Sequence, residues 1–181
     1  MIEIALHLLD IVQNSIKADA ENIKITVYEN TDENILSLKV EDDGKGMSEE
    51  TLQRAQSPFY TTSDVKRIGL GISLLKSACE SAEGSFYITS KRGEGTTLKA
   101  DFKYDSVNRQ PLGDMATTIS NLLMCNRNVG FIYEHTYNGK HFIFDSDEYS
   151  PAATEIVKRG ENVHQWLIDT LNEKINTIYS K

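Results

Sequence analysis

Two short segments that alternate apolar and polar residues constrain the fold of this chain more than any other feature. Residues 23–28 and 35–40 both show this alternation, and a polar connection, residues 29–34, joins them. A period of two residues is typical of a β-strand with one buried face, and a short polar connection is typical of a hairpin. The chain should therefore contain an antiparallel pair of strands near its N-terminus.

Segments with helical spacing surround this hairpin. Residues 4–18 place apolar side chains three and four residues apart, and Ser48 can cap a short helix that begins at Glu49. The further elements expected in this part are helices at residues 49–55 and 72–82 and strands at residues 85–90 and 96–104. This order predicts an α/β two-layer sandwich, in which helices cover a mixed, mostly antiparallel sheet.

Changes in composition divide the chain into three parts. We expect a first domain over residues 1–104, a linker over residues 105–113 and a small α+β region over residues 114–181. The elements expected in this last region are a helix at residues 115–124, strands at 129–137 and 141–144, and a helix at 163–175. An Asn-Gly pair lies between the two strands and predicts a hairpin.

Charge and cysteine content limit the partners and the compartment. The net charge of −8 opposes general binding to nucleic acid. Cys79 and Cys125 lack metal-ligand spacing, as do His135, His141 and His164, so we expect two reduced thiols and no metal cluster of these residues. Because neither a signal peptide nor a run of about 20 apolar residues is present, we expect a cytoplasmic protein that does not enter the membrane.

A carboxylate beside two glycines at the end of a strand suits a purine site. Asp42 is followed by Gly44 and Gly46 and then by Met47. Glycines let a flat base approach the backbone, and a carboxylate can accept a hydrogen bond from an exocyclic amine. The same residues are also typical of an ordinary turn after a strand, so both interpretations stay open.

A second pair of glycines precedes a helix. Gly69 and Gly71 flank Leu70, and free N–H groups at the start of a helix can bind phosphate oxygens. A tight turn into a helix also needs glycine without any ligand. Residues 57–68, which lead into this pair, show no periodicity and are expected to form a long loop of the kind that often serves as a lid.

Three polar residues form a stripe along the first expected helix. Asp10, Asn14 and Lys17 are four and three residues apart, so they lie on one helix face. They supply a carboxylate, a neutral oxygen ligand and a cation, which are the groups that position water, magnesium and phosphate. A solvated helix face would carry similar residues, but Asn is a poor helix former, which favours a functional reason for Asn14.

The order of these motifs resembles the GHKL superfamily, which comprises gyrase-type, Hsp90-type, histidine-kinase and mismatch-repair ATPases with the Bergerat fold. The similar segments are residues 9–18 (the N box), 42–47 and 69–72 (two glycine boxes), 93–97 (the last box) and 58–62 (the start of the ATP lid). The resemblance covers about residues 1–104. It implies that ATP and Mg²⁺ are the ligands.

The resemblance also implies roles for individual residues. Asn14 would bind Mg²⁺, and Asp42 would accept a hydrogen bond from the adenine amine. Thr96 would help to hold adenine, and Lys17 would neutralise phosphate charge. The other residues implied in nucleotide binding are Gly44, Gly46, Met47, Gly69, Leu70 and Gly71 in the walls and Thr61, Thr62, Lys66 and Arg67 on the lid.

The resemblance leaves the reaction open. In the ATP-hydrolysing branches, a glutamate four residues before the Mg²⁺ asparagine is the general base, and here that residue is Asp10, whose carboxylate reaches less far. Transfer to histidine requires a helical phosphoacceptor module ahead of the N box. Because the sequence begins at the N box, we expect a stand-alone domain without that module.

Two functions are consistent with these residues. The first is a regulatory protein in which ATP orders the lid and switches binding to a protein partner, with ATPase or protein kinase activity through Asp10. The alternative is a non-catalytic, anti-sigma-like module that holds ATP structurally. Turnover of ATP, and its dependence on Asp10, would distinguish the two.

Overall fold

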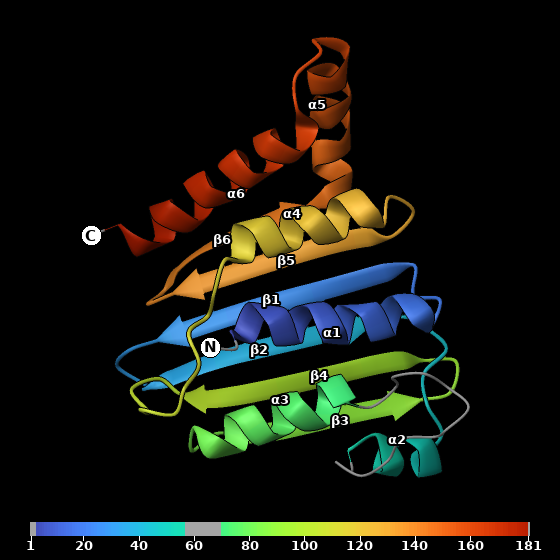
Figure 1. Cartoon of the computed structure of the whole chain (residues 1–181), viewed down its shortest axis with the longest axis vertical. Helices are drawn as coiled ribbons and strands as arrows, with labels where there is room; N and C mark the ends of the chain where they lie inside the picture. The colour runs from blue at the N-terminus through green and yellow to red at the C-terminus, as the bar shows by residue number, and fades with distance from the viewer. Residues whose placement is uncertain (1–2, 57–69, 181) are drawn as a thin grey trace.

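The computed structural model describes residues 3–56 and 70–180, and their arrangement is shown in Figure 1. The helices in these residues are α1 (Ile4–Lys17), α2 (Glu49–Ala55), α3 (Leu70–Ser81), α4 (Met115–Cys125), α5 (Ser146–Lys158) and α6 (Val163–Tyr179). The strands are β1 (Asn22–Asn30), β2 (Ile35–Asp42), β3 (Ser85–Lys91), β4 (Gly95–Lys103), β5 (Gly130–Tyr137) and β6 (Lys140–Asp145). Every helix and strand expected from the sequence is present, with small differences at the ends.

The strands form one sheet in the order β3-β4-β2-β1-β5-β6. β1 and β2 pair antiparallel, as the alternating pattern predicts, with Ile25 opposite Val40. The pairs β2–β4, β3–β4 and β5–β6 are antiparallel as well. β1 and β5 run parallel, with Ile25 opposite Tyr133. The sheet is therefore mixed and mostly antiparallel.

Helices cover one face of this sheet. α1, α3 and α4 lie over the same face in Figure 1. Alternate residues of β1 are buried, among them Ile23, Ile25 and Val27, and they join one core with residues of the helices. The other face carries paired charges such as Lys24 and Glu134, whose Nζ and Oε1 atoms are 2.9 Å apart. The predicted α/β two-layer sandwich is confirmed.

The C-terminal part of the chain extends the same sheet. β5 lies beside β1 from Gly130, opposite Asn22, to Tyr137, opposite Glu29. α4 and α6 pack on each other, and most of their buried apolar residues belong to the same core as those of α1. The domain boundary after residue 104 stays a prediction, although one hydrophobic core continues across it.

α5 has no counterpart among the helices expected from the sequence. It contains Pro151, a residue that usually ends or kinks a helix, and none of its side chains is fully buried. Its N-terminus is capped by Asp145, whose Oδ1 accepts a hydrogen bond from the backbone nitrogen of Asp147 over 2.9 Å. Within the described parts of the chain, no helix combines the length and apolar character that crossing a membrane requires.

Candidate functional site

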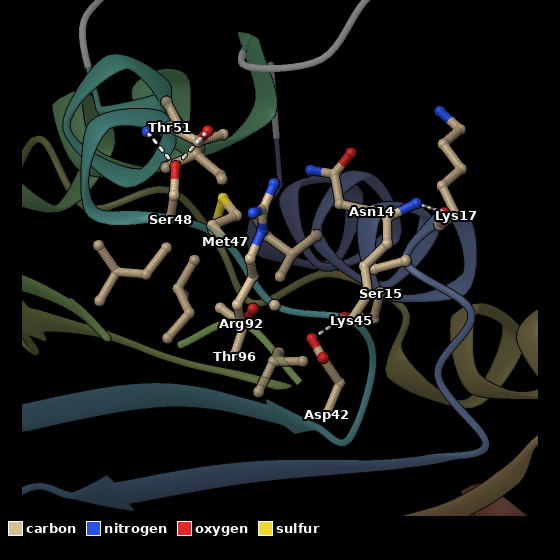
Figure 2. Close-up of a pocket in the computed structure, with 18 residues that line it drawn as sticks. Asn14, Ser15, Lys17, Asp42, Lys45, Met47, Ser48, Thr51, Arg92 and Thr96 are labelled. Atoms are coloured by element: carbon tan, nitrogen blue, oxygen red, sulfur yellow. Dashed lines mark hydrogen bonds between the residues drawn. The ribbon is translucent and has the colours of Figure 1, made fainter. Parts of the chain in front are cut away.

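A cavity of about 490 Å³ lies between α1, α2 and one end of the sheet. Figure 2 shows the side chains that line it. The apolar lining residues are Ile11, Ala18, Val40, Met47, Ala55, Ile72, Ile88 and Leu98. The other lining residues are Asn14, Ser15, Lys17, Asp42, Lys45, Gly46, Ser48, Thr51, Arg92 and Thr96. A cavity of this size that combines apolar walls with convergent polar side chains is typical of a site for a small organic ligand.

Asp42 ends β2, and its carboxylate is part of the cavity wall (Figure 2). Its Oδ2 accepts a hydrogen bond from Ser15 Oγ over 2.6 Å, and its Oδ1 accepts one from the backbone nitrogen of Gly44 over 3.0 Å. Each carboxylate oxygen has two lone pairs, so both oxygens can accept a second hydrogen bond. The carboxylate is thus already oriented and still able to accept a ligand donor.

The carboxylate of the neighbouring residue Asp43 binds groups of the protein itself. Its Oδ1 accepts hydrogen bonds from the backbone nitrogens of Glu21 and Asn22 over 2.8 and 2.9 Å. Asn22 Nδ2 donates to Asp43 Oδ2 over 2.7 Å. These bonds, the backbone one from Asn22 first, hold the pKa of Asp43 below its ordinary value. Asp43 therefore anchors the loop after β2 to the start of β1, while Asp42 remains available at the cavity.

The two glycines after Asp42 allow this loop to pack closely. A Cβ on Gly44 would lie 2.7 Å from the carbonyl oxygen of Ala18 at the end of α1. Gly46 has φ +60°, and a Cβ there would lie 2.0 Å from the carbonyl oxygen of Lys91. Both positions exclude a side chain, and the loop is therefore pressed between α1 and the β3–β4 turn.

Cations outnumber carboxylates around the cavity. Lys17, Lys45 and Arg92 line it, whereas Asp42 is the one acidic residue among the described lining residues. Lys45 Nζ donates to the carbonyl oxygen of Lys17 over 3.3 Å, so these two residues are adjacent. A chain with a net charge of −8 thus has a locally positive cavity, which favours an anionic ligand.

Thr96 belongs to a hydrogen-bonded group at the cavity wall. Ser90 Oγ lies 2.9 Å from Thr96 Oγ1 and donates to the Gly95 carbonyl oxygen over 2.9 Å. The same Ser90 oxygen accepts a hydrogen bond from the backbone nitrogen of Met47 over 2.8 Å. The β3–β4 pair and the loop after β2 are therefore joined at the wall to which Met47 and Thr96 both contribute.

Six of the predicted site residues meet at the cavity. They are Asn14, Lys17, Asp42, Gly46, Met47 and Thr96. Gly44 lies directly behind Asp42, to which its backbone nitrogen donates. Their proposed roles with a nucleotide stay predictions.

The remaining predicted residues do not line the cavity or lie outside the described residues. Asp10 and Gly71 meet where α1 approaches α3, since a Cβ on Gly71 would lie 2.8 Å from Asp10 Cβ. Leu70, at the start of α3, is 45% exposed and is likewise absent from the cavity wall. The predictions outside the described residues concern Thr61, Thr62, Lys66, Arg67 and Gly69.

Sequence reasoning missed several residues of the site. Ser15, which orients Asp42, follows Asn14 directly, but a serine in a helix carries no functional signal by itself. Lys45 lies inside the glycine motif, and Arg92 lies in the β3–β4 turn beside the last motif. Positively charged residues beside glycines in an otherwise acidic chain were the signal that could have identified Lys45 and Arg92.

Comparison with known families identifies this arrangement. A family model described as "Histidine kinase-, DNA gyrase B-, and HSP90-like ATPase" matches residues 2–106, more than half of the chain. The chain belongs to this ATPase family. The predicted GHKL resemblance is confirmed, and the match spans all elements that line the cavity, from α1 to β4.

Curated relatives that share this ATPase region include bacterial kinases. The sensor histidine kinase YvrG and sporulation kinase E, both from Bacillus subtilis (strain 168), are 30% and 32% identical over 98 and 92 residues. These alignments span 52% and 50% of this chain but only 17% and 12% of the two kinases. The similarity is therefore limited to a small part of each kinase.

A solved structure shares the fold of the ATPase-family chain. The crystal structure of the N-terminal domain of a DNA repair protein superimposes with a TM-score of 0.59 at 16% identity. The superposition covers 79% of this chain and 52% of the DNA repair protein chain, so the likeness extends beyond the residues that match the family model. At this level of identity the likeness concerns the fold alone.

Proposed function

We propose that this chain is a regulatory ATP-binding protein of the cytoplasm, which binds ATP with Mg²⁺ in the cavity and couples its occupancy to binding of a protein partner. The observation that carries the proposal is the oriented carboxylate of Asp42 in a locally positive cavity of an ATPase-family domain. Membership of the family supports ATP as the ligand. The charge of the lining residues supports an anionic one.

The geometry around Asp42 favours adenine as the base. The exocyclic amine of adenine is a donor, and Asp42 offers oriented acceptors. Guanine presents a carbonyl oxygen at the same position, and its lone pairs would face the carboxylate. Apolar side chains such as Val40, Ile88 and Leu98 line the same cavity and suit the faces of a flat base.

Asn14 fits the requirements of a magnesium site completed by phosphates. Among residues 3–56 and 70–180, no three His, Cys, Asp or Glu side chains come close enough together to hold a metal ion. Mg²⁺ usually keeps several waters and takes one or two protein oxygens together with substrate phosphates. The side-chain oxygen of Asn14 can be one such ligand, and the ion would neutralise phosphate charge and bridge the phosphates to α1.

Isothermal titration with a non-hydrolysable ATP analogue tests this function. The wild-type chain and Asn14→Ala are titrated with and without Mg²⁺, and a GTP analogue is titrated under the same conditions. We expect binding of the ATP analogue that strengthens with Mg²⁺, and weak or no binding of the GTP analogue. The Mg²⁺ effect should disappear in Asn14→Ala. Asn121→Ala, on the exposed side of α4, is the matched control and should bind as wild type.

Two results would contradict the proposal. No binding heat at millimolar ATP analogue in a folded sample would remove ATP as the ligand. Equal affinity for the adenine and guanine nucleotides would show that Asp42 does not select the base. Retention of the Mg²⁺ effect in Asn14→Ala would reject only the assignment of the metal ligand.

A second candidate function is a module that holds ATP without turnover. The position of Asp10 favours it, because this exposed residue packs beside Gly71 and is not among the residues that line the cavity. A general base must lie within hydrogen-bond reach of the attacking water, directly or through one water. Release of phosphate from ATP, measured for the wild type and for Asp10→Asn, separates the two functions. Turnover that is lost in Asp10→Asn supports catalysis, and absence of turnover at saturating ATP supports the module.

A further inference from the structure

Arg92 lines the cavity but has no role in the function proposed above. It lies in the turn between β3 and β4, four residues before Thr96. In Figure 2 its guanidinium extends between the side chains of Met47 and Asn14, and all three residues line the cavity. A long cationic side chain therefore projects into the space that a ligand would fill.

The backbone that carries Arg92 is held in place. The backbone nitrogen of Gly93 donates to the carbonyl oxygen of Lys45 over 2.9 Å, which joins the turn to the loop after Asp42. On the other side of the turn, Ser90 bonds to Thr96 and to the backbone nitrogen of Met47. The backbone position of Arg92 is thus fixed relative to Asp42 and Thr96.

Arg92 differs from its cationic neighbours in its partners. Lys91 forms an ion pair with Glu94, and Lys45 is bonded to the Lys17 carbonyl oxygen. Within residues 3–56 and 70–180, no hydrogen bond or ion pair engages the Arg92 side chain. A guanidinium presents several donors in one plane and matches carboxylate and phosphate oxygens in pairs. An anionic group of the ligand would complete its bonding.

We propose that Arg92 binds the α-phosphate of the nucleotide. This inference rests on the proposed function, in which Asp42 contacts the adenine amine and Asn14 contacts Mg²⁺ at the outer phosphates. Arg92 starts from the turn that leads to Thr96 and extends toward Asn14, so its guanidinium would lie along the middle of a ligand that spans from Asp42 to Asn14. The ribose and the α-phosphate occupy that middle part, and the phosphate is the anion of the two.

A series of ligands with increasing numbers of phosphates tests the assignment. Adenosine, AMP, ADP and a non-hydrolysable ATP analogue are titrated into the wild type, Arg92→Leu, Arg92→Lys and the control Lys91→Leu. Lys91 is a cation of the same turn that pairs with Glu94 and does not line the cavity. Circular dichroism and thermal melting verify that each variant is folded.

The expected result is a loss that begins with the first phosphate. Arg92→Leu should weaken AMP, ADP and the ATP analogue by the same factor, about tenfold or more, because each loses one charge-assisted hydrogen-bonded contact. Adenosine should bind equally to both proteins. Arg92→Lys should lose less, since an ammonium keeps the charge but not the paired donors. Lys91→Leu should match the wild type.

Other patterns would overturn the assignment. An equal loss for adenosine would mean that Arg92 contacts the base or ribose, and a loss confined to ADP and the ATP analogue would mean that it contacts an outer phosphate. No loss for any ligand would mean that Arg92 makes no contact with the nucleotide. If the wild type and Lys91→Leu bind no ATP analogue, the proposed function fails together with this inference. That result is distinct from a wild type that binds and an Arg92→Leu variant that binds equally well.

Discussion

Near each end of β1 a polar cluster lies on the same face of the sheet. The open cluster, Asp42 and Ser15, lines the cavity, and the closed cluster, Glu29, Tyr133, His135 and Tyr179, does not. The strand register places Asp42 opposite Ile23 at one end and Glu29 opposite Tyr137 at the other. Glu29 is 3% exposed and bonds to His135, which is fully buried.

The closed cluster satisfies its polar atoms with protein groups. His135 Nε2 lies 3.0 Å from Glu29 Oε1, and His135 Nδ1 lies 2.7 Å from the hydroxyl of Tyr133. The hydroxyl of Tyr179, in the last turn of α6, donates to the same Glu29 oxygen. Asp42, by contrast, keeps acceptor capacity toward a cavity. The comparison separates a polar cluster that holds elements together from one that is prepared for a ligand.

The largest effect expected from this comparison is a loss of stability in Glu29→Ala. Glu29→Ala removes the acceptor shared by the buried ring of His135 and the hydroxyl of Tyr179, and because buried donors without a partner are costly, the free energy of unfolding should fall by about 3 kcal/mol. Urea denaturation measures this change. Nucleotide affinity of the folded protein should stay as in the wild type. Glu29→Gln keeps an oxygen acceptor and should lose less, and a loss below about 1 kcal/mol in Glu29→Ala would show that the cluster does not hold the fold.

Asp42→Ala should show the opposite pattern. The affinity for the ATP analogue should fall by about 10- to 100-fold, because a hydrogen bond to a charged acceptor contributes about 1.5–3 kcal/mol. The free energy of unfolding should change by about 1 kcal/mol at most, since Asp42 is half-buried and water in the cavity that Ser15 lines can replace the lost carboxylate. Titration and urea denaturation of the same sample give both values. A variant that loses stability and retains affinity would reverse the assignment of the two clusters.

A smaller effect is expected at the contact between α6 and the closed cluster. Tyr179→Phe removes the hydroxyl that donates to Glu29 and should lower the free energy of unfolding by about 1 kcal/mol. Urea denaturation at pH 7 measures this loss. A stability equal to that of the wild type would mean that the hydrogen bond from this hydroxyl does not stabilise the packing of α6.

The same residue makes stability depend on alkaline pH. Burial, followed by the hydrogen bond to Glu29, raises the pKa of Tyr179 above its ordinary value of 10.0. The unfolded chain then releases this proton at lower pH than the folded chain, so stability should fall as the pH rises above 10.0. Burial raises the pKa of Tyr133 in the same direction. The fall should therefore be shallower in Tyr179→Phe but not absent, and an unchanged slope would contradict the role of Tyr179.

The sequence predicts the open cluster better than the closed one because the open one follows from local patterns. Asp42 and the glycines after it are close in the chain, and Asp10 and Asn14 are four residues apart, which places them on one helix face. Glu29 and His135 are separated by 106 residues, and Glu29 and Tyr179 by 150. Their contact depends on the parallel pairing of β1 with β5, which no local periodicity encodes. α5 was missed for a different reason, since Pro151 lies inside it and proline usually interrupts a helix.

The smallest expected effect concerns the hydrogen bond inside the open cluster. Ser15 is buried, and its hydroxyl donates to Asp42 over 2.6 Å without touching the parts of the site assigned to phosphate. Ser15→Ala frees Asp42 Oδ2 and should weaken the ATP analogue by about threefold to tenfold, because the carboxylate must then be oriented when the ligand binds. Ser15→Thr keeps a hydroxyl and is the matched variant, and titration of both measures the difference. A loss of stability without a loss of affinity in Ser15→Ala would mean that this bond stabilises the fold, as the bonds of the closed cluster do. The clusters at the two ends of β1 would then differ in exposure but not in function.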